Sequence, residues 1–197
     1  MIVRPAAPRD VARVAELHVD RIHEGFLATL GTGFLRRLYR RALLFPEAFV
    51  LVATAGCELV SPVVGFVAGA HDLARLYRTF LLRDGLVAGV VAAPRLARSL
   101  PRVFETLRYP ATTDELPRAE VLAVAVAADQ TGQGVGHRLV DAAMREFGAH
   151  DTPAVKVVAG SANRAALRLY EGCGFTRRRT ITIHGQARSE VLVWPSS

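Results

Sequence analysis

The sequence is poor in the residues that mark several classes of protein. It has only two cysteines among 197 residues, Cys57 and Cys173, and their positions give none of the paired spacings of a metal site. We therefore expect no metal ion, no disulfide framework, and two reduced thiols in a cytoplasmic protein. Cys173 lies between two glycines, and we interpret it as a structural thiol in preference to a catalytic one.

Long apolar runs are also missing. The longest stretches without charge, such as Leu59 to His71, are shorter than the roughly 20 residues that a membrane-spanning helix requires. The first ten residues, MIVRPAAPRD, lack the apolar core of a signal peptide. Because 51% of the residues are hydrophobic and no low-complexity tract occurs, we expect a globular protein without a membrane span, folded as one domain over residues 1–197.

Lysine is almost absent, since Lys156 is the only one, and the net charge of +7 therefore comes from arginine. A basic chain can bind nucleic acid, an anionic membrane face or an anionic small ligand. No nucleic-acid-binding motif accompanies the arginines, which are spread over many predicted helices. We expect no nucleic-acid partner, and we attribute part of the charge to an anionic ligand and the rest to solvated surface.

The most informative stretch runs from Glu120 to Phe147. It begins with a valine-rich segment typical of a strand buried on both faces, continues through glycines at 132, 134 and 136, and ends with apolar residues at helical spacing. Glycines allow backbone N–H groups to converge, and a helix N-terminus adds roughly half a positive charge. The pattern predicts a phosphate-binding turn, with a glycine-rich turn that holds no ligand as the alternative.

The glycine spacing argues against two common phosphate-binding motifs. A P-loop would continue with Gly-Lys-Ser/Thr, whereas Gly136 is followed by His137 and Arg138. A dinucleotide fingerprint needs G-x-G-x-x-G, whereas this turn reads G-x-G-x-G.

The turn resembles that of the GNAT superfamily of acyl-CoA-dependent N-acetyltransferases. The signature of that superfamily is a valine-rich strand followed by Arg/Gln-x-x-Gly-x-Gly/Ala at the start of a helix. The matching residues here are Thr131-Gly132-Gln133-Gly134-Val135-Gly136, with Thr131 in place of the usual Arg or Gln. The superfamily's next strand and helix end in Asn-x-x-Ala-x-x-x-Tyr-x-x-x-Gly-Phe, which occurs here as Asn163, Ala166, Tyr170, Gly174 and Phe175.

The resemblance implies the fold class: a single α/β GNAT-fold domain with a mixed, mostly antiparallel twisted sheet flanked by helices. Residues 71–118 exceed the superfamily pattern and predict a helical insertion before the central strand. Its apolar residues recur helically over 73–80 and 87–91, a third helix is expected over 101–107, and prolines separate these short helices from a final loop over 109–118. The insertion could cover the acceptor side of the site, pack on a second subunit in a homodimer, or enlarge the core.

The resemblance also implies acetyl-CoA as co-substrate. Its pantetheine arm would pair with the backbone of Val124–Val126, where this strand splays from the strand at Val155, and an N–H of the strand would face the thioester oxygen. Asn163 would bond the pantetheine arm or fix the start of its helix. The expected cofactor-binding residues are Val124, Ala125, Val126, Thr131, Gly132, Gln133, Gly134, Val135, Gly136 and Asn163.

Two residues are predicted to be catalytic. The tyrosine that matches Tyr170 protonates the leaving sulfur in many family members, and the alternative is a tyrosine that caps the core. An acid at the strand position of Glu120 is the general base in the histone-acetylating branch, and the alternative is a carboxylate without a role. Burial would raise the pKa of Glu120 and help it accept a proton.

These assignments predict direct transfer of an acetyl group to a primary amine of a small molecule. The alternatives are a protein or peptide N-acetyltransferase and a non-catalytic acyl-CoA-binding sensor. In the superfamily, the first two helices and their connecting loop form a wall of the acceptor pocket. The candidates for acceptor contact, each of which could instead pack in the core, are His18, His23, Phe26 and Tyr39.

Overall fold

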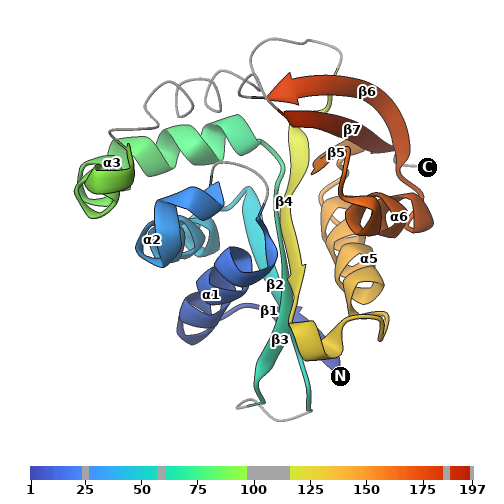
Figure 1. Ribbon diagram of the computed structural model, residues 1–197, viewed down its shortest axis with the longest axis horizontal. Helices are drawn as coiled ribbons and strands as arrows, with labels where there is room; N and C mark the ends of the chain where they lie inside the picture. Colours follow the sequence, from blue (N-terminus) through green and yellow to red (C-terminus); the bar gives the residue numbers. More distant parts are fainter. Residues whose placement is uncertain (24–26, 57–60, 97–115, 184–186, 196–197) are drawn as a thin grey trace.

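The protein is built around a seven-stranded sheet in the order β1-β2-β3-β4-β5-β7-β6 (Figure 1). In this computed structural model the described residues are 1–23, 27–56, 61–96, 116–183 and 187–195. Neighbouring strands are antiparallel except for β4 and β5, which confirms the mixed, mostly antiparallel sheet. The strands are β1 (Ile2–Pro5), β2 (Ala48–Thr54), β3 (Val63–Ala70), β4 (Ala119–Val126), β5 (Ala154–Gly160), β6 (Thr176–Ile183) and β7 (Ala187–Pro195).

Helices cover both faces of the sheet, because each amphipathic helix must bury one apolar stripe. On one face lie α1 (Val11–Arg21), α2 (Gly31–Leu44) and α3 (Leu73–Leu96), and on the other lie α5 (Val135–Gly148) and α6 (Arg164–Gly172) (Figure 1). Short 3₁₀ turns precede α1 and α2 at Pro8–Asp10 and Leu27–Leu30, and a third follows β4 at Ala128–Gln130.

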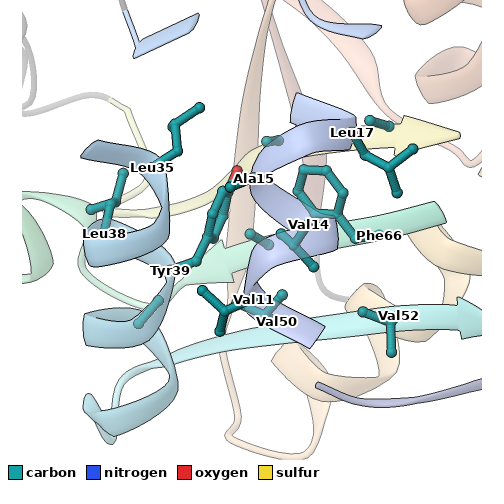
Figure 2. Close-up of a cluster of buried hydrophobic side chains, with 14 of the residues drawn as sticks. Val11, Val14, Ala15, Leu17, Leu35, Leu38, Tyr39, Val50, Val52 and Phe66 are labelled. Carbon is teal, nitrogen blue, oxygen red and sulfur yellow. The ribbon is translucent and has the colours of Figure 1, made fainter. Parts of the chain in front are cut away.

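The sheet divides the interior into two apolar cores. The core under α1, α2 and α3 contains Tyr39 and Phe66, both fully buried, with their ring centroids 5.4 Å apart. Figure 2 shows how α1 and α2 direct their apolar side chains onto β2 and β3 here. The second core lies between the opposite face and α5 and α6, and includes Leu139, Phe147 and Tyr170.

The predicted insertion departs from its expected pattern in one respect. Residues 73–80 and 87–91, expected as separate short helices, belong to one helix that runs from Leu73 to Leu96. The only breaker between them is Gly85, and a glycine costs a helix only about 1 kcal/mol relative to alanine. Pro94 falls within the last turn of α3 instead of ending the helix before it. The predicted helix over 101–107, and residues 109–115 of the predicted loop, lie outside the described residues.

A β-bulge in β4 sets which side chains face which core. Ala123 pairs with Ala68 of β3 and Val121 pairs with Gly69, so Leu122 has no counterpart. An extra residue reverses the alternation of side chains beyond it. Val121 therefore belongs to the α5 side, whereas Ala123 belongs to the α1–α3 side.

The pairing of β4 with β5 ends at the same point. It consists of three residue pairs, Ala119–Val155, Glu120–Lys156 and Val121–Val157, and it does not continue beyond Val121. Because a bulge bends its strand and increases the local twist, the bulge at Leu122 accounts for the separation of the two strands here. The splay that the family resemblance implied between these strands is confirmed.

Candidate active site

The separation of β4 and β5 leaves one edge of β4 without a strand partner among the described residues. The N–H of Ala127 donates to the carbonyl of Val64 on β3 at 2.7 Å. Backbone groups alternate along an antiparallel strand, so Ala125 also directs its N–H and C=O toward β3, while Val124 and Val126 direct theirs toward the open edge. Of the three predicted strand contacts, the structure thus brings Val124 and Val126 to this edge, and Ala125 faces away from it.

One of these edge groups already has a partner. Nε of Arg21, at the end of α1, donates to the carbonyl of Val126 at 3.0 Å. The guanidinium joins the end of α1 to the strand at the edge of the predicted site. The backbone groups left for the pantetheine arm at this edge are therefore the N–H of Val126 and both groups of Val124. This is one group fewer than the sequence predicted.

The predicted phosphate-binding turn lies at the start of α5, immediately after β4 and its 3₁₀ turn. Gly132 and Gly134 have φ values of 82° and 75°, which L side chains rarely adopt, and a Cβ added to either would meet nothing within 4 Å. The turn is thus open on the side where side chains would stand. The first N–H groups of α5, from Val135 on, have no intrahelical partner and carry the positive end of the helix dipole.

The third glycine of the turn also has a packing role. A Cβ on Gly136 would lie 3.3 Å from Cδ2 of Leu169 on α6, so this glycine allows α5 and α6 to pack closely.

The polar side chains of the turn bond the chain locally. The hydroxyl of Thr131 donates to the carbonyl of Ala127 at 3.3 Å, and Nε2 of Gln133 donates to the carbonyl of Asp129 at 3.1 Å. Thr131 therefore stabilises the turn from the position where the superfamily usually has Arg or Gln.

Asn163 stands at the N-cap of α6. Its Oδ1 accepts a hydrogen bond from the N–H of Ala166 at 3.1 Å, which satisfies one of the free donors of the first turn. Of the two roles predicted for Asn163, the structure shows that it fixes the start of the helix.

Glu120 lies in the three-residue pairing of β4 with β5, where it is only 8% exposed. Its neighbour is Lys156, 3% exposed, whose Nζ lies 3.3 Å from Oε2 of Glu120. The ammonium donates a hydrogen bond to the carbonyl of Pro117, whereas Oε2 of Glu120 is buried and receives no hydrogen bond from any described residue. The carboxylate thus has a counter-ion and a free lone pair.

Burial raises the pKa of Glu120, and the charge and the close contact of Lys156 partly offset this effect. Two tyrosines interact electrostatically with the same carboxylate. Burial raises the pKa of Tyr77 on α3, and the charge of Glu120 raises it further. Burial also raises the pKa of Tyr170 on α6, with smaller contributions from Cys173 and Glu120. The charge of Glu120 thus reaches both tyrosines, of which Tyr77 belongs to the core under α1, α2 and α3 and Tyr170 to the core under α5 and α6.

Sequence reasoning assigned no site role to Lys156 or Tyr77. The lysine carried a usable signal, because a lone charge between Val155 and Val157 in a buried strand requires a partner. Which acid it would meet depends on the strand order and on the parallel register. Tyr77 carried no such signal, because it follows the helical spacing of ordinary core residues.

Two of the four candidates for acceptor contact belong to the core. Nδ1 of His18 and the hydroxyl of Tyr39 share a hydrogen bond at 2.5 Å, and both rings pack near Phe66. Burial lowers the pKa of His18 to about 4, so the imidazole is neutral at physiological pH. His23 is exposed, and Phe26 lies outside the described residues.

Cys173 is half-buried at the end of α6. Burial and the nearby Asp141 raise the pKa of its thiol to about 11. The thiol is therefore protonated at neutral pH, which is consistent with the structural interpretation and unfavourable for a nucleophile. Cys57 lies outside the described residues.

Within the described ranges, no three histidine, cysteine or acidic side chains come together in a group that could hold a metal ion. None of the helices described has both the length and the hydropathy that crossing a membrane requires.

Comparison with known proteins gives the family. A model of the acetyltransferase (GNAT) family matches residues 21–175. Arabidopsis thaliana NAA60 in complex with acetyl-CoA superposes with a TM-score of 0.63 at 17% identity, over 98% of this chain and 97% of that one. A GNAT-family acetyltransferase from Streptococcus pneumoniae gives a TM-score of 0.61 at 15% identity, over 100% and 99% of the two chains. A variant of spermidine N-acetyltransferase from Vibrio cholerae gives 0.60 at 14%, over 99% and 95%.

No protein with a curated description matches this sequence significantly. At identities of 14–17% the structural likeness shows the fold alone, whereas the family model covers most of the chain. The chain therefore belongs to the GNAT family of acetyltransferases. It is an acyl-CoA-dependent N-acetyltransferase, and acetyl-CoA is its co-substrate.

Proposed function

We propose that the protein transfers the acetyl group of acetyl-CoA directly to a primary amine of a small molecule, with Glu120 as general base and Tyr170 as general acid. One observation carries this proposal. A buried carboxylate with a free lone pair lies one residue before the end of the pairing of β4 with β5, and its charge contributes to the raised pKa of the buried Tyr170. Acid–base catalysis of acyl transfer needs two such groups close to the reacting bond.

The backbone around this point is suited to the co-substrate. The pantetheine arm contains peptide-like amides, which can pair with Val124 and with the N–H of Val126 as an added strand. The pyrophosphate can approach the start of α5, where Gly132 and Gly134 leave the backbone accessible. When bound, acetyl-CoA supplies the activated acyl group, and these groups of the protein hold and orient it.

The two side chains then move the protons of the reaction. Glu120 accepts the proton that the acceptor amine loses as its nitrogen bonds to the acyl carbon. Tyr170 donates a proton to the sulfur as the C–S bond breaks. The raised pKa of Glu120 makes it a stronger base than an exposed glutamate, and the raised pKa of Tyr170 keeps its hydroxyl protonated at neutral pH.

Burial of the base favours a small acceptor. Glu120 is 8% exposed, α3 packs against β4, and Tyr77 of α3, which interacts electrostatically with Glu120, is also 8% exposed. A small amine can reach such a carboxylate unaided, whereas a lysine on a folded protein would have to insert its whole side chain. Similar structures include both substrate classes, namely spermidine N-acetyltransferase and the NatC complex bound to a peptide.

A panel of acceptors tests the proposal. The purified protein is incubated with acetyl-CoA and with polyamines, simple primary amines, amino acids, peptides with free N-termini, or lysine peptides, and released thiol is measured. We expect a small primary amine to give a higher kcat/KM than any peptide. Turnover of peptides alone would make the protein a peptide N-acetyltransferase. Binding of acetyl-CoA without turnover of any acceptor would indicate a sensor.

A further inference from the structure

Lys156 is a charged residue in the buried interior, where an unpaired charge would be unfavourable. It is the only lysine of the chain, it is 3% exposed, and it lies between Val155 and Val157, which are buried in the second core. Burial of an ammonium group is costly unless it is paired. Its partner is fixed by the sheet, because the parallel register of β4 and β5 places Lys156 directly beside Glu120.

The contacts of Lys156 hold its charge close to the carboxylate without using up the carboxylate's lone pair. Its Nζ donates to the carbonyl of Pro117, two residues before β4 begins, and lies 3.3 Å from Oε2 of Glu120. Oε2 receives no hydrogen bond from any described residue. The hydrogen bond to Pro117 thus anchors the ammonium, which acts on Glu120 mainly through its charge.

The other neighbours of Glu120 bring no competing charge at neutral pH. Tyr77 on α3 and Tyr170 on α6 interact with it electrostatically, and the raised pKa of each keeps it uncharged. The residue paired with Glu120 on β3 is Ala70. Lys156 is therefore the charged group among the described residues that is in direct contact with Glu120.

A purely structural role explains this arrangement poorly. Well-packed apolar residues of similar volume often replace a buried ion pair with little loss of stability, or with a gain. A general base, by contrast, must be ionised at the working pH even though it is buried, and an adjacent anchored cation provides that condition.

We propose that Lys156 is a positioning residue of the transfer reaction, whose anchored ammonium keeps the buried Glu120 ionised and oriented to accept a proton from the acceptor amine. This inference rests on the proposed function of Glu120. It assigns a catalytic purpose to a residue outside both motifs of the family resemblance.

The first test is the pH dependence of kcat/KM for the best acceptor in the wild type, Lys156→Met and Lys156→Arg. The acceptor's own titration affects all three profiles equally. Without the cation Glu120 holds its proton to higher pH. The kcat/KM of Lys156→Met should therefore be lower than that of the wild type by about tenfold or more at pH 7, and within about threefold of it at pH 9.5. Lys156→Arg should stay closer to the wild type at both values. A loss that is equal at all pH values would overturn the proposal.

A second test needs no enzymatic activity and is carried out on the wild type, with one variant used only for assignment. Because Lys156 is the only lysine, ¹⁵N-lysine labelling gives a single side-chain resonance, and carboxyl ¹³C labelling follows Glu120, assigned with Glu120→Gln. In the wild type we expect the Lys156 resonance to change at the same pH as that of Glu120. A Lys156 resonance that is insensitive to the titration of Glu120 would refute the coupling.

The two tests separate this inference from the proposed function. If Glu120→Gln retains full activity, then Glu120 is not the base and the proposed function fails, whatever the resonances show. If Glu120→Gln is inactive while Lys156→Met keeps the wild-type pH profile, the proposed function stands and the role of Lys156 is wrong.

Discussion

Glu120 and Lys156 stand side by side in the parallel pairing of β4 and β5, with Nζ of the lysine 3.3 Å from Oε2 of the glutamate. Removal of either partner leaves the other as an unpaired buried charge, which typically costs about 3–5 kcal/mol. Removal of both leaves no such charge. We therefore expect Glu120→Gln and Lys156→Met each to lower the free energy of unfolding. The loss in the double variant should be smaller than the sum of the two single losses by about 1–3 kcal/mol. Urea unfolding of the four proteins measures this coupling, and additive effects would show that the charges do not interact.

Tyr170 and Tyr77 form a matched pair for testing the general acid. Both are buried, and the charge of Glu120 contributes to the raised pKa of each. Tyr170→Phe removes only the hydroxyl, so we expect kcat to fall by at least about tenfold while the Kd for acetyl-CoA stays within about twofold. Tyr77→Phe removes an equivalent hydroxyl from α3 and should have a much smaller effect. Equal losses in the two variants would contradict the assignment of Tyr170 as the acid.

The phosphate-binding turn can be tested at Gly134. The site is open, and Asp and Asn both tolerate its positive φ better than most residues, so both variants should fold. Gly134→Asp places a carboxylate where the phosphates should lie, and we expect the Kd for acetyl-CoA to rise by about tenfold or more, or roughly 1.4 kcal/mol. Gly134→Asn, which adds the same bulk without charge, should weaken binding less.

Gly148 offers the control for this measurement, because it lies at the opposite end of α5 and is equally open. Gly148→Asp should leave the Kd unchanged in calorimetry. A folded Gly134→Asp that binds acetyl-CoA with wild-type affinity would show that the phosphates bind elsewhere.

His18 should make the stability of the protein depend on pH. Burial lowers its pKa to about 4, whereas in the unfolded chain a histidine titrates near 6.5. Between these values the unfolded state binds more protons than the folded state, so stability is present above about pH 6.5 and is lost as the pH falls toward 4. From pH 6.5 to 4.5 the wild type should lose about 2 kcal/mol more than His18→Asn, which keeps a polar atom near the Nδ1 position. Urea unfolding at the two pH values measures these losses. An equal loss of stability in the wild type and in His18→Asn would show that His18 is accessible to protons.

The sequence alone predicted the features that local patterns encode. The valine-rich strand, the glycine turn and the helix after it appear as β4, residues 131–134 and α5, and Asn163 and Tyr170 fall at the start and in the last turn of α6. Each of these depends on residues within about one turn or strand of each other, which is the range over which periodicity and capping act.

Features that depend on strand pairing could not be predicted in the same way. Leu122 belongs to an unbroken apolar run, and a strand buried on both faces shows no alternation from which a bulge could be read. The contact between Glu120 and Lys156 joins residues 36 positions apart in sequence, and it exists only because β4 and β5 are parallel in that register. The hydrogen bond from Arg21 to Val126 likewise joins elements that only the tertiary fold brings together.

Glu120 as the general base is the central element of the proposed mechanism, and a single-turnover experiment with Glu120→Gln tests it. Protein saturated with acetyl-CoA is mixed at pH 7 with the best acceptor of the panel, and the rate of acetyl transfer is followed in the wild type and in the variant. Since the substitution keeps the shape of the side chain but cannot accept the proton, we predict a rate lower by about 10²–10⁴-fold with an unchanged Kd for acetyl-CoA. A folded Glu120→Gln that transfers acetyl within about threefold of the wild-type rate would contradict the account.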